Sequence, residues 1–171
     1  NEFFFYDDTY TTHKARVFEI CELIIKNKLD IRYFVNLRAD TMTEDLTIAL
    51  KESGLILGYL GVESGDQRIL DQTGKGESKE EIRKACAIMR NQKLPFTCSF
   101  IIGHPGDTHE SIQATIDFAK ELDSDQVKFL IATPFPGTEL YRLAKKLGKI
   151  EDIDPMKFDD YTCYQHVAVN L

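Results

Sequence analysis

A fivefold alternation of short apolar runs with longer segments of helical period is the feature that most constrains this fold. The apolar runs predict strands at residues 2–6, 31–37, 56–62, 96–102 and 127–132. After each run, apolar residues recur every three or four positions, which predicts helices at about 12–28, 43–53, 78–92, 108–123 and 137–147. Nearly continuous apolar strands separated by helices are typical of a parallel sheet covered on its faces. The sequence therefore predicts an α/β protein made of five βα units.

Two architectures fit five βα units. One is a complete doubly wound sheet, in which the neighbouring strands run 2-1-3-4-5. The other is a piece of a (β/α) barrel, whose eight-unit form needs about 250 residues and whose strands run 1-2-3-4-5. In both, ligands bind at the carboxyl ends of the strands, so the strand ends are the places to search for chemistry.

Composition limits the function classes. The chain has 171 residues, 43% of them hydrophobic, and a net charge of −7, which disfavours a nucleic-acid partner held through its phosphates. The longest apolar runs are far shorter than the roughly 20 residues that span a bilayer, and the first residues do not resemble a signal peptide. A cytoplasmic protein is expected. The four cysteines are far apart in sequence and predict free thiols rather than a zinc or redox pair: Cys21, Cys86, Cys98 and Cys163.

The first three strand ends carry polar groups. Asp7 and Asp8 follow the first strand and could bind a metal or an ammonium group, or cap the next helix. Arg38 follows the second strand and could bind a carboxylate or phosphate, or pair with an acidic loop. Glu63 and Ser64 follow the third strand as candidate ligand contacts, with a merely polar turn as the alternative.

The fourth strand ends in the stretch FIIGHPGDTHES, residues 100–111. Gly103 permits close backbone approach, Pro105 stiffens the turn, and Asp107 and Glu110 have the spacing of a capping box. A helix that begins here would favour an anionic group at its N-terminus. The stretch is either a plain connector or one wall of a ligand site, and it lacks the lysine of a P-loop.

The fifth strand ends in two prolines, Pro134 and Pro136, which leave carbonyl acceptors on a stiff backbone. Such a backbone could contact an adenine edge, and a stiff turn is an equally good explanation. The acidic pair after the first strand also resembles the receiver domains of two-component signalling. However, the third strand ends without an aspartate, and Thr133-Pro134 stands where receivers have Lys-Pro. No Gly-x-Gly-x-x-Gly follows any strand, which excludes a Rossmann dinucleotide site.

Taken together, the five strand ends resemble the radical S-adenosylmethionine (radical SAM) superfamily. The motifs that carry the likeness occur in this order: FFFYDDTYT, RYFVNLRAD, LGVESGDQRIL with GKGESKEEI, FIIGHPGDTHESI, and PFPGTELYRLAKKLG. The match is closest to the branch with anaerobic magnesium-protoporphyrin monomethyl ester cyclases and cobalamin-dependent members. It implies a partial (β/α) TIM-like barrel with sequential parallel strands over residues 1–150, followed by an extension over 151–171. The alternative is a non-catalytic, receiver-like signalling or binding module.

The resemblance also implies that the chain is a fragment of a larger enzyme. In this family the first strand leads into a Cys-x-x-x-Cys-x-x-Cys loop that holds a [4Fe–4S] cluster, and the chain matches the family only from its second strand. We therefore expect the cluster, S-adenosylmethionine (SAM) and, in some members, cobalamin to serve the parent protein, with none bound to this chain. The implied chemistry is reductive cleavage of SAM to a 5′-deoxyadenosyl radical, as in an oxidative cyclase, acting on a small-molecule substrate.

Site residues follow from the matched positions, which do not identify the catalytic residues and include no metal ligand. Asp7 and Asp8 stand where the family contacts the methionine amino group, and Arg38 is compatible with binding the methionine carboxylate. Glu63 and Ser64 match a position that contacts the ribose hydroxyls or the methionine end. The remaining positions are those that lie along the adenine: Ile102, Gly103, Pro105, Pro134 and Pro136.

The first strand is expected to be an open sheet edge. An edge with three phenylalanines is a template for self-association unless something covers it. The missing N-terminal part of the same polypeptide is one expected partner for this edge. Residues 160–169 alternate enough in polarity to form a further strand that could cover an edge.

Overall fold

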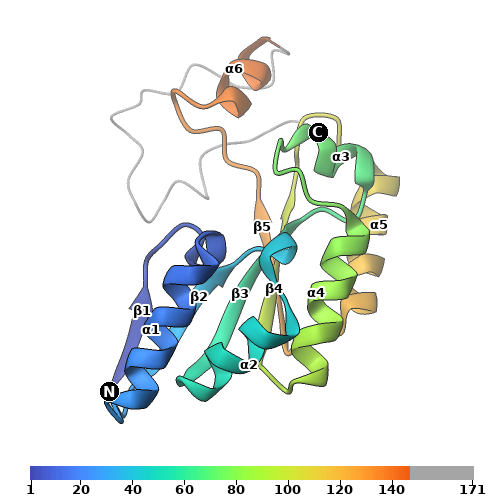
Figure 1. Cartoon of the computed structure of the whole chain (residues 1–171). Coiled ribbons are helices and arrows are strands. Elements are labelled where there is room, and N and C mark those ends of the chain that lie inside the picture. Colours follow the sequence, from blue (N-terminus) through green and yellow to red (C-terminus); the bar gives the residue numbers. More distant parts are fainter. Residues whose placement is uncertain (147–171) are drawn as a thin grey trace.

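Five parallel strands form one sheet, in the order β1-β2-β3-β4-β5, in the computed structural model, which describes residues 1–146 (Figure 1). This sequential order confirms the prediction of a partial barrel and differs from the 2-1-3-4-5 order of a receiver domain. Each strand begins and ends within one residue of its predicted position. The strands are β1 (Glu2–Phe5), β2 (Arg32–Leu37), β3 (Leu55–Glu63), β4 (Phe96–Ile102) and β5 (Gln126–Ile131).

The five predicted helices are also present, each within two residues of its expected ends. They are α1 (Lys14–Lys26), α2 (Glu44–Glu52), α4 (Lys79–Asn91), α5 (His109–Leu122) and α6 (Glu139–Lys146). A sixth, α3 (Gln67–Gln72), was not predicted, because it is too short to show a helical period. Asp66 caps it by accepting hydrogen bonds from the N–H groups of Arg68 and Ile69. Two single 3₁₀ turns, Tyr10–Thr12 and Ala39–Thr41, complete the list.

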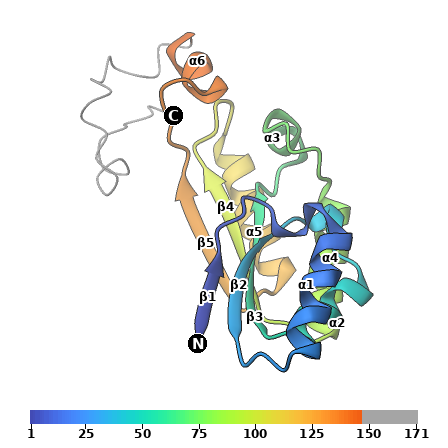
Figure 2. The ribbon, with the colours of Figure 1, turned by 60° about the vertical axis from the view of Figure 1, so that its left-hand side comes forward.

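Helices α1, α2, α4 and α5 lie on one face of the sheet, and the hydrophobic core lies between them and the strands (Figure 2). Strand β2 shows how the sequence produces this arrangement. Tyr33, Val35 and Leu37 point under the helices and are buried, whereas Phe34 and Asn36 alternate onto the other face and remain partly exposed. Within residues 1–146 no helix covers that second face, so the expectation of cover on both faces is wrong here.

We call the uncovered face of the sheet the inner face, since it corresponds to the interior of a barrel. It carries aromatic and polar side chains from all five strands. These side chains include Phe4, Phe34, Asn36, Tyr59, Ser99 and Lys128.

Strands β1 and β5 are the two edges of the sheet, which confirms β1 as an edge. Phe3 and Phe4 of β1 are 49% and 36% exposed. Self-association through this edge stays a prediction.

Three predictions fall outside the described residues: the strand at 160–169, the free thiol of Cys163 and the boundary near residue 150. No helix in the described part has the length and apolar character needed to cross a membrane.

Candidate functional site

A pocket of about 250 Å³ lies on the inner face at the carboxyl ends of the strands, where the sheet topology predicts ligand binding. Its lining includes Asp8, Asn36, Arg38, Tyr59, Gly61, Glu63, Lys75 and Ser99, and we call it the strand-end pocket. A larger pocket, of about 460 Å³, surrounds Pro95 and Asp125 at the opposite end, where β4 and β5 begin. Because barrel enzymes use the carboxyl ends of their strands, the strand-end pocket is the candidate site.

A buried carboxylate, Glu77, organises the charges around this pocket. Its side chain is 0% exposed. One oxygen, Oε1, accepts a 2.7 Å hydrogen bond from the N–H of Ala39 and lies 3.8 Å from Nε of Arg38. The other, Oε2, lies 3.1 Å from Nζ of Lys75. Buried charges are stable only when paired, so Glu77 fixes two cations from separate loops at the pocket wall.

Lys75 joins this buried carboxylate to the end of β3. Its Nζ donates a hydrogen bond to the carbonyl of Gly61 and lies 3.3 Å from Oε1 of Glu63. Glu63 has a φ of +71°, in the left-handed region that non-glycine residues rarely occupy. The pairing of β3 with β4 also shifts register between Gly61 and Glu63. Such strain persists only where the surroundings impose it, and it is typical of functional sites.

The absence of a side chain at Gly61 makes this arrangement possible. A Cβ placed there would lie 2.8 Å from Nζ of Lys75 and 2.9 Å from Oε1 of Glu63. Both distances are shorter than a carbon atom tolerates. Glycine therefore lets an ammonium group and a carboxylate meet directly over the strand.

The side chain of Arg38 is held mainly by Asp40, two residues along the chain. Its Nε and Nη2 donate hydrogen bonds to the carboxylate of Asp40 at 3.0 and 2.9 Å, and Nη2 also donates to the carbonyl of Lys75 at 3.0 Å. The hydrogen bond from Arg38 lowers the pKa of Asp40. Of the two roles that the sequence left open for Arg38, pairing with a neighbouring acidic loop is the one observed. Its guanidinium nonetheless lines the pocket.

The adjacent candidates at the other strand ends separate in space. Asp8 and Glu63 line the pocket, but Asp7 instead pairs with Arg16 of α1 at 2.6 Å. Ser64 is buried, and its Oγ lies 3.1 Å from Oγ1 of Thr115, which ties the turn after β3 to α5. The pocket lining therefore contains one residue from each of these adjacent pairs.

The Gly-His-Pro-Gly turn after β4 is closed by the carboxylate of Asp107, the residue that directly follows it. Oδ2 of Asp107 accepts hydrogen bonds from the N–H groups of Gly103 and His104, at 2.8 and 2.9 Å. The predicted capping box of Asp107 with Glu110 is wrong, because Asp107 folds back onto this turn. The helix is instead capped by Thr108 with Ser111. These two N–H groups are consequently satisfied without a ligand.

The remaining candidates lie away from the strand-end pocket. Pro105 and His104 line another, mostly apolar pocket of about 230 Å³ against Leu140 and Leu143 of α6. Burial lowers the pKa of His104, and its Nε2 is buried with no hydrogen-bond partner in the described part of the chain. The other candidates line neither pocket: Ile102 and Gly103 at the end of β4, and Pro134 and Pro136 after β5.

Comparison with known proteins decides the family. The model of the radical SAM superfamily matches residues 1–119. The chain belongs to the radical SAM superfamily. It is also 40% identical over 170 residues to an uncharacterized methyltransferase of Pyrococcus horikoshii, and this match covers 94% of the chain.

One further relative is a cyclase of the kind that the resemblance named, and one solved structure shares the fold. An anaerobic magnesium-protoporphyrin IX monomethyl ester cyclase of Rubrivivax gelatinosus is 28% identical over 91% of this chain. The structure of a radical SAM methyltransferase of Kitasatospora setae, with cobalamin and a [4Fe–4S] cluster bound, has a TM-score of 0.76 at 17% identity, covering 88% of this chain and 31% of that enzyme. The chain spans 37% of the Pyrococcus relative and 28% of the Rubrivivax relative.

The two cofactors of the radical SAM family fit the described residues unequally. Cys21, Cys86 and Cys98 are buried in the core under the helices, and no cluster of three or more metal-ligating side chains occurs within residues 1–146. These cysteines therefore do not fit an iron–sulfur cluster. The strand-end pocket does fit the methionine end of SAM in its chemistry, because its lining offers both cations and carboxylates, the groups that pair with a carboxylate and an ammonium.

Proposed function

We propose that this chain is the SAM-binding part of a radical SAM enzyme and that its strand-end pocket binds the methionine end of SAM even in the isolated chain, where the resemblance implied no bound SAM. That end carries an ammonium group and a carboxylate on one carbon. The carboxylates of Asp8 and Glu63 suit the ammonium group, and the ammonium of Lys75 suits the carboxylate. Opposite charges in a partly buried pocket attract more strongly than in water, so the pairs favour a zwitterion over a neutral ligand.

The observation that carries the proposal is the meeting of Lys75 and Glu63 over Gly61. It places the ammonium of Lys75 and the carboxylate of Glu63 side by side at a strand end. In this proposal the adenosine end lies along the turn after β4, beside Ile102, Gly103 and Pro105, with Pro134 and Pro136 at its far edge. Arg38, which stays paired with Asp40, adds positive charge near the methionine carboxylate of SAM.

The activity of the parent protein is proposed as a radical reaction on a small molecule, in the cytoplasm. In the parent protein a [4Fe–4S] cluster, which the described residues of this chain do not hold, would supply the electron for cleaving SAM. The residues of this chain bind and orient SAM and exclude water from it. The name of the Pyrococcus relative favours methyl transfer and that of the Rubrivivax relative favours an oxidative reaction. Cobalamin in the parent is part of the same proposal.

Replacing Gly61 by alanine tests the pocket. The added Cβ forces apart the flexible ends of Lys75 and Glu63, so the fold survives while the charges are displaced. Displacing the Lys75 ammonium weakens a charge-assisted hydrogen bond to the ligand, a contact that contributes about 1.5–3 kcal/mol, so we expect SAM to bind about tenfold more weakly. The measurement is calorimetric titration of the 171-residue chain with SAM.

Gly74→Ala is the matched control for that experiment. Gly74 lies in the loop that contains Lys75 and has a φ of +68°, but a Cβ there would meet nothing within 4 Å. The substitution therefore strains the backbone without filling the pocket. Equal SAM affinities for the two variants would overturn the assignment of this pocket.

A further inference from the structure

We propose that the inner face beside this pocket binds an aromatic group that carries an anionic substituent, and that Lys128 is the cation that selects it. This subsite would belong to the substrate, and it rests on the proposed function of the neighbouring SAM pocket. A lysine ammonium attracts a carboxylate or a phosphate as a point charge, so the anion is assigned by charge.

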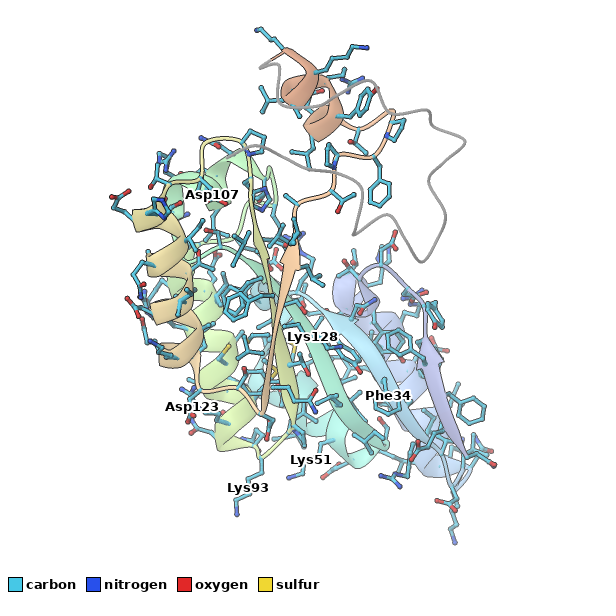
Figure 3. All side chains as sticks on the ribbon, turned by 180° about the vertical axis from the view of Figure 1, so that it is seen from behind. Phe34, Lys51, Lys93, Asp107, Asp123 and Lys128 are labelled. Atoms are coloured by element: carbon cyan, nitrogen blue, oxygen red, sulfur yellow. The ribbon has the colours of Figure 1, made fainter. Side chains whose placement is uncertain are left out.

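The register of the sheet brings Lys128 next to the pocket. Gly61 of β3 pairs with Ser99 of β4, and Ser99 pairs with Lys128 of β5, so the three residues form one row across the inner face. Gly61 and Ser99 both line the pocket. Lys128 is therefore one strand beyond its wall, on the face shown toward the viewer in Figure 3.

The charge of Lys128 is unbalanced, unlike that of the other two cations. Lys75 and Arg38 are paired with Glu63, Glu77 and Asp40. Lys128 has no carboxylate within 4.0 Å anywhere in residues 1–146, and its Nζ lies 4.6 Å from the centroid of the Tyr59 ring. A cation held over a ring keeps its attraction for an anion, because the ring carries no net charge.

The aromatic side chains beneath Lys128 supply the apolar surface of the subsite. The Tyr59 ring lies 5.6 Å from that of Phe4 and 6.5 Å from that of Phe34, between centroids. These rings are partly exposed on the uncovered face. Aromatic ligands pack against such rings in offset or edge-on geometry. The rings alone would accept any apolar ligand, and Lys128 adds the preference for negative charge.

The test is a nuclear magnetic resonance titration of the full chain with 2-naphthoate, 2-naphthyl phosphate and neutral 2-naphthamide, with and without SAM. These probes share one ring system and differ in charge. We expect at least one anionic probe to bind about fivefold more tightly than the amide, as in an exposed ion pair, and to shift the Tyr59 resonances. In Lys128→Met the preference should fall to about one, while SAM affinity stays unchanged. Lys128→Arg should keep the preference.

Lys93→Met controls for net charge, because Lys93 lies at the other end of the sheet (Figure 3). Failure of both anions to outbind the amide, or loss of the preference in Lys93→Met as well, would overturn the subsite. The tighter of the two anions identifies the carboxylate or phosphate class. A charge preference that depends on Lys128 in a chain that does not bind SAM would uphold the subsite and reject the proposed function.

Discussion

Glu77→Gln is expected to lower the free energy of unfolding by about 3 kcal/mol, the low end of the range for breaking a buried ion pair. Glutamine keeps the shape of the side chain, and its oxygen can still accept the hydrogen bond from Ala39, but the substitution removes the charge and turns an amide N–H donor toward the Lys75 ammonium. Lys75 and Arg38 then lose their shared buried partner. The loss stays at the low end because Glu63 and Asp40 still pair with these cations. Urea denaturation followed by circular dichroism measures the change.

Glu80→Gln removes the same charge three residues away. The side chain of Glu80 is 84% exposed and, among residues 1–146, its one ion pair is with Arg83, so we expect a change within about 0.5 kcal/mol. If both variants unfolded at the same urea concentration, Glu77 would not be the electrostatic centre of the site.

Lys75→Met is expected to weaken SAM binding by about 10- to 100-fold. Hydrogen bonds to charged groups contribute about 1.5–3 kcal/mol, and methionine retains the apolar stem of lysine without its ammonium. Lys75 is the pocket cation nearest to Gly61, where the methionine carboxylate is proposed to lie. The dissociation constant for SAM, measured by calorimetry on the folded variant, gives the effect.

Lys84→Met is the control, because Lys84 lies exposed on α4 and lines none of the pockets described above. It should bind SAM like the unmodified chain. A Lys75→Met variant that bound SAM with unchanged affinity would remove Lys75 from the site, whatever its effect on stability.

The strands and most helices could be predicted because each is long enough to show its period. The alternation of Tyr33, Val35 and Leu37 with Phe34 and Asn36 also indicates which side of β2 meets the helices. What the sequence could not show is that the second face lacks helices in the described residues. An apolar residue such as Phe34 is expected both in a strand covered on two faces and in a strand that lines a barrel interior, so the sequence does not distinguish the two.

The candidate site was only partly predictable. Strand ends led to Asp8, Arg38 and Glu63, which do line one pocket. The sequence does not mark Lys75 and Glu77 as site residues, although the motif GKGESKEEI, which carries part of the family resemblance, contains them. They lie in a loop between two helices, and only the fold brings them under β3. A lysine and a glutamate in a polar loop carry no signal of burial, and Glu77 is buried only because Oε1 accepts a hydrogen bond from Ala39 while Oε2 forms an ion pair with Lys75.

The turn after β4 shows the same limit at shorter range. Its glycines and proline correctly predicted a tight turn before a helix, and the expected N-terminus of that helix favoured an anionic group. The anion proved to be Asp107, four residues along the chain from Gly103. The spacing of Asp107 and Glu110 favoured a capping box, but the acceptor oxygens of Asp107 serve the turn instead, and the adjacent Thr108 caps the helix.

The strand-end pocket is proposed to recognise the amino-acid end of SAM. The most direct measurement compares the affinity of the unmodified chain for SAM with its affinity for 5′-methylthioadenosine, which has the same adenosine and a thioether but no ammonium or carboxylate. The charges at Lys75, Glu63 and Asp8 predict that SAM binds at least about tenfold more tightly. Equal affinity for the two compounds, or no saturable binding of SAM, would contradict the account.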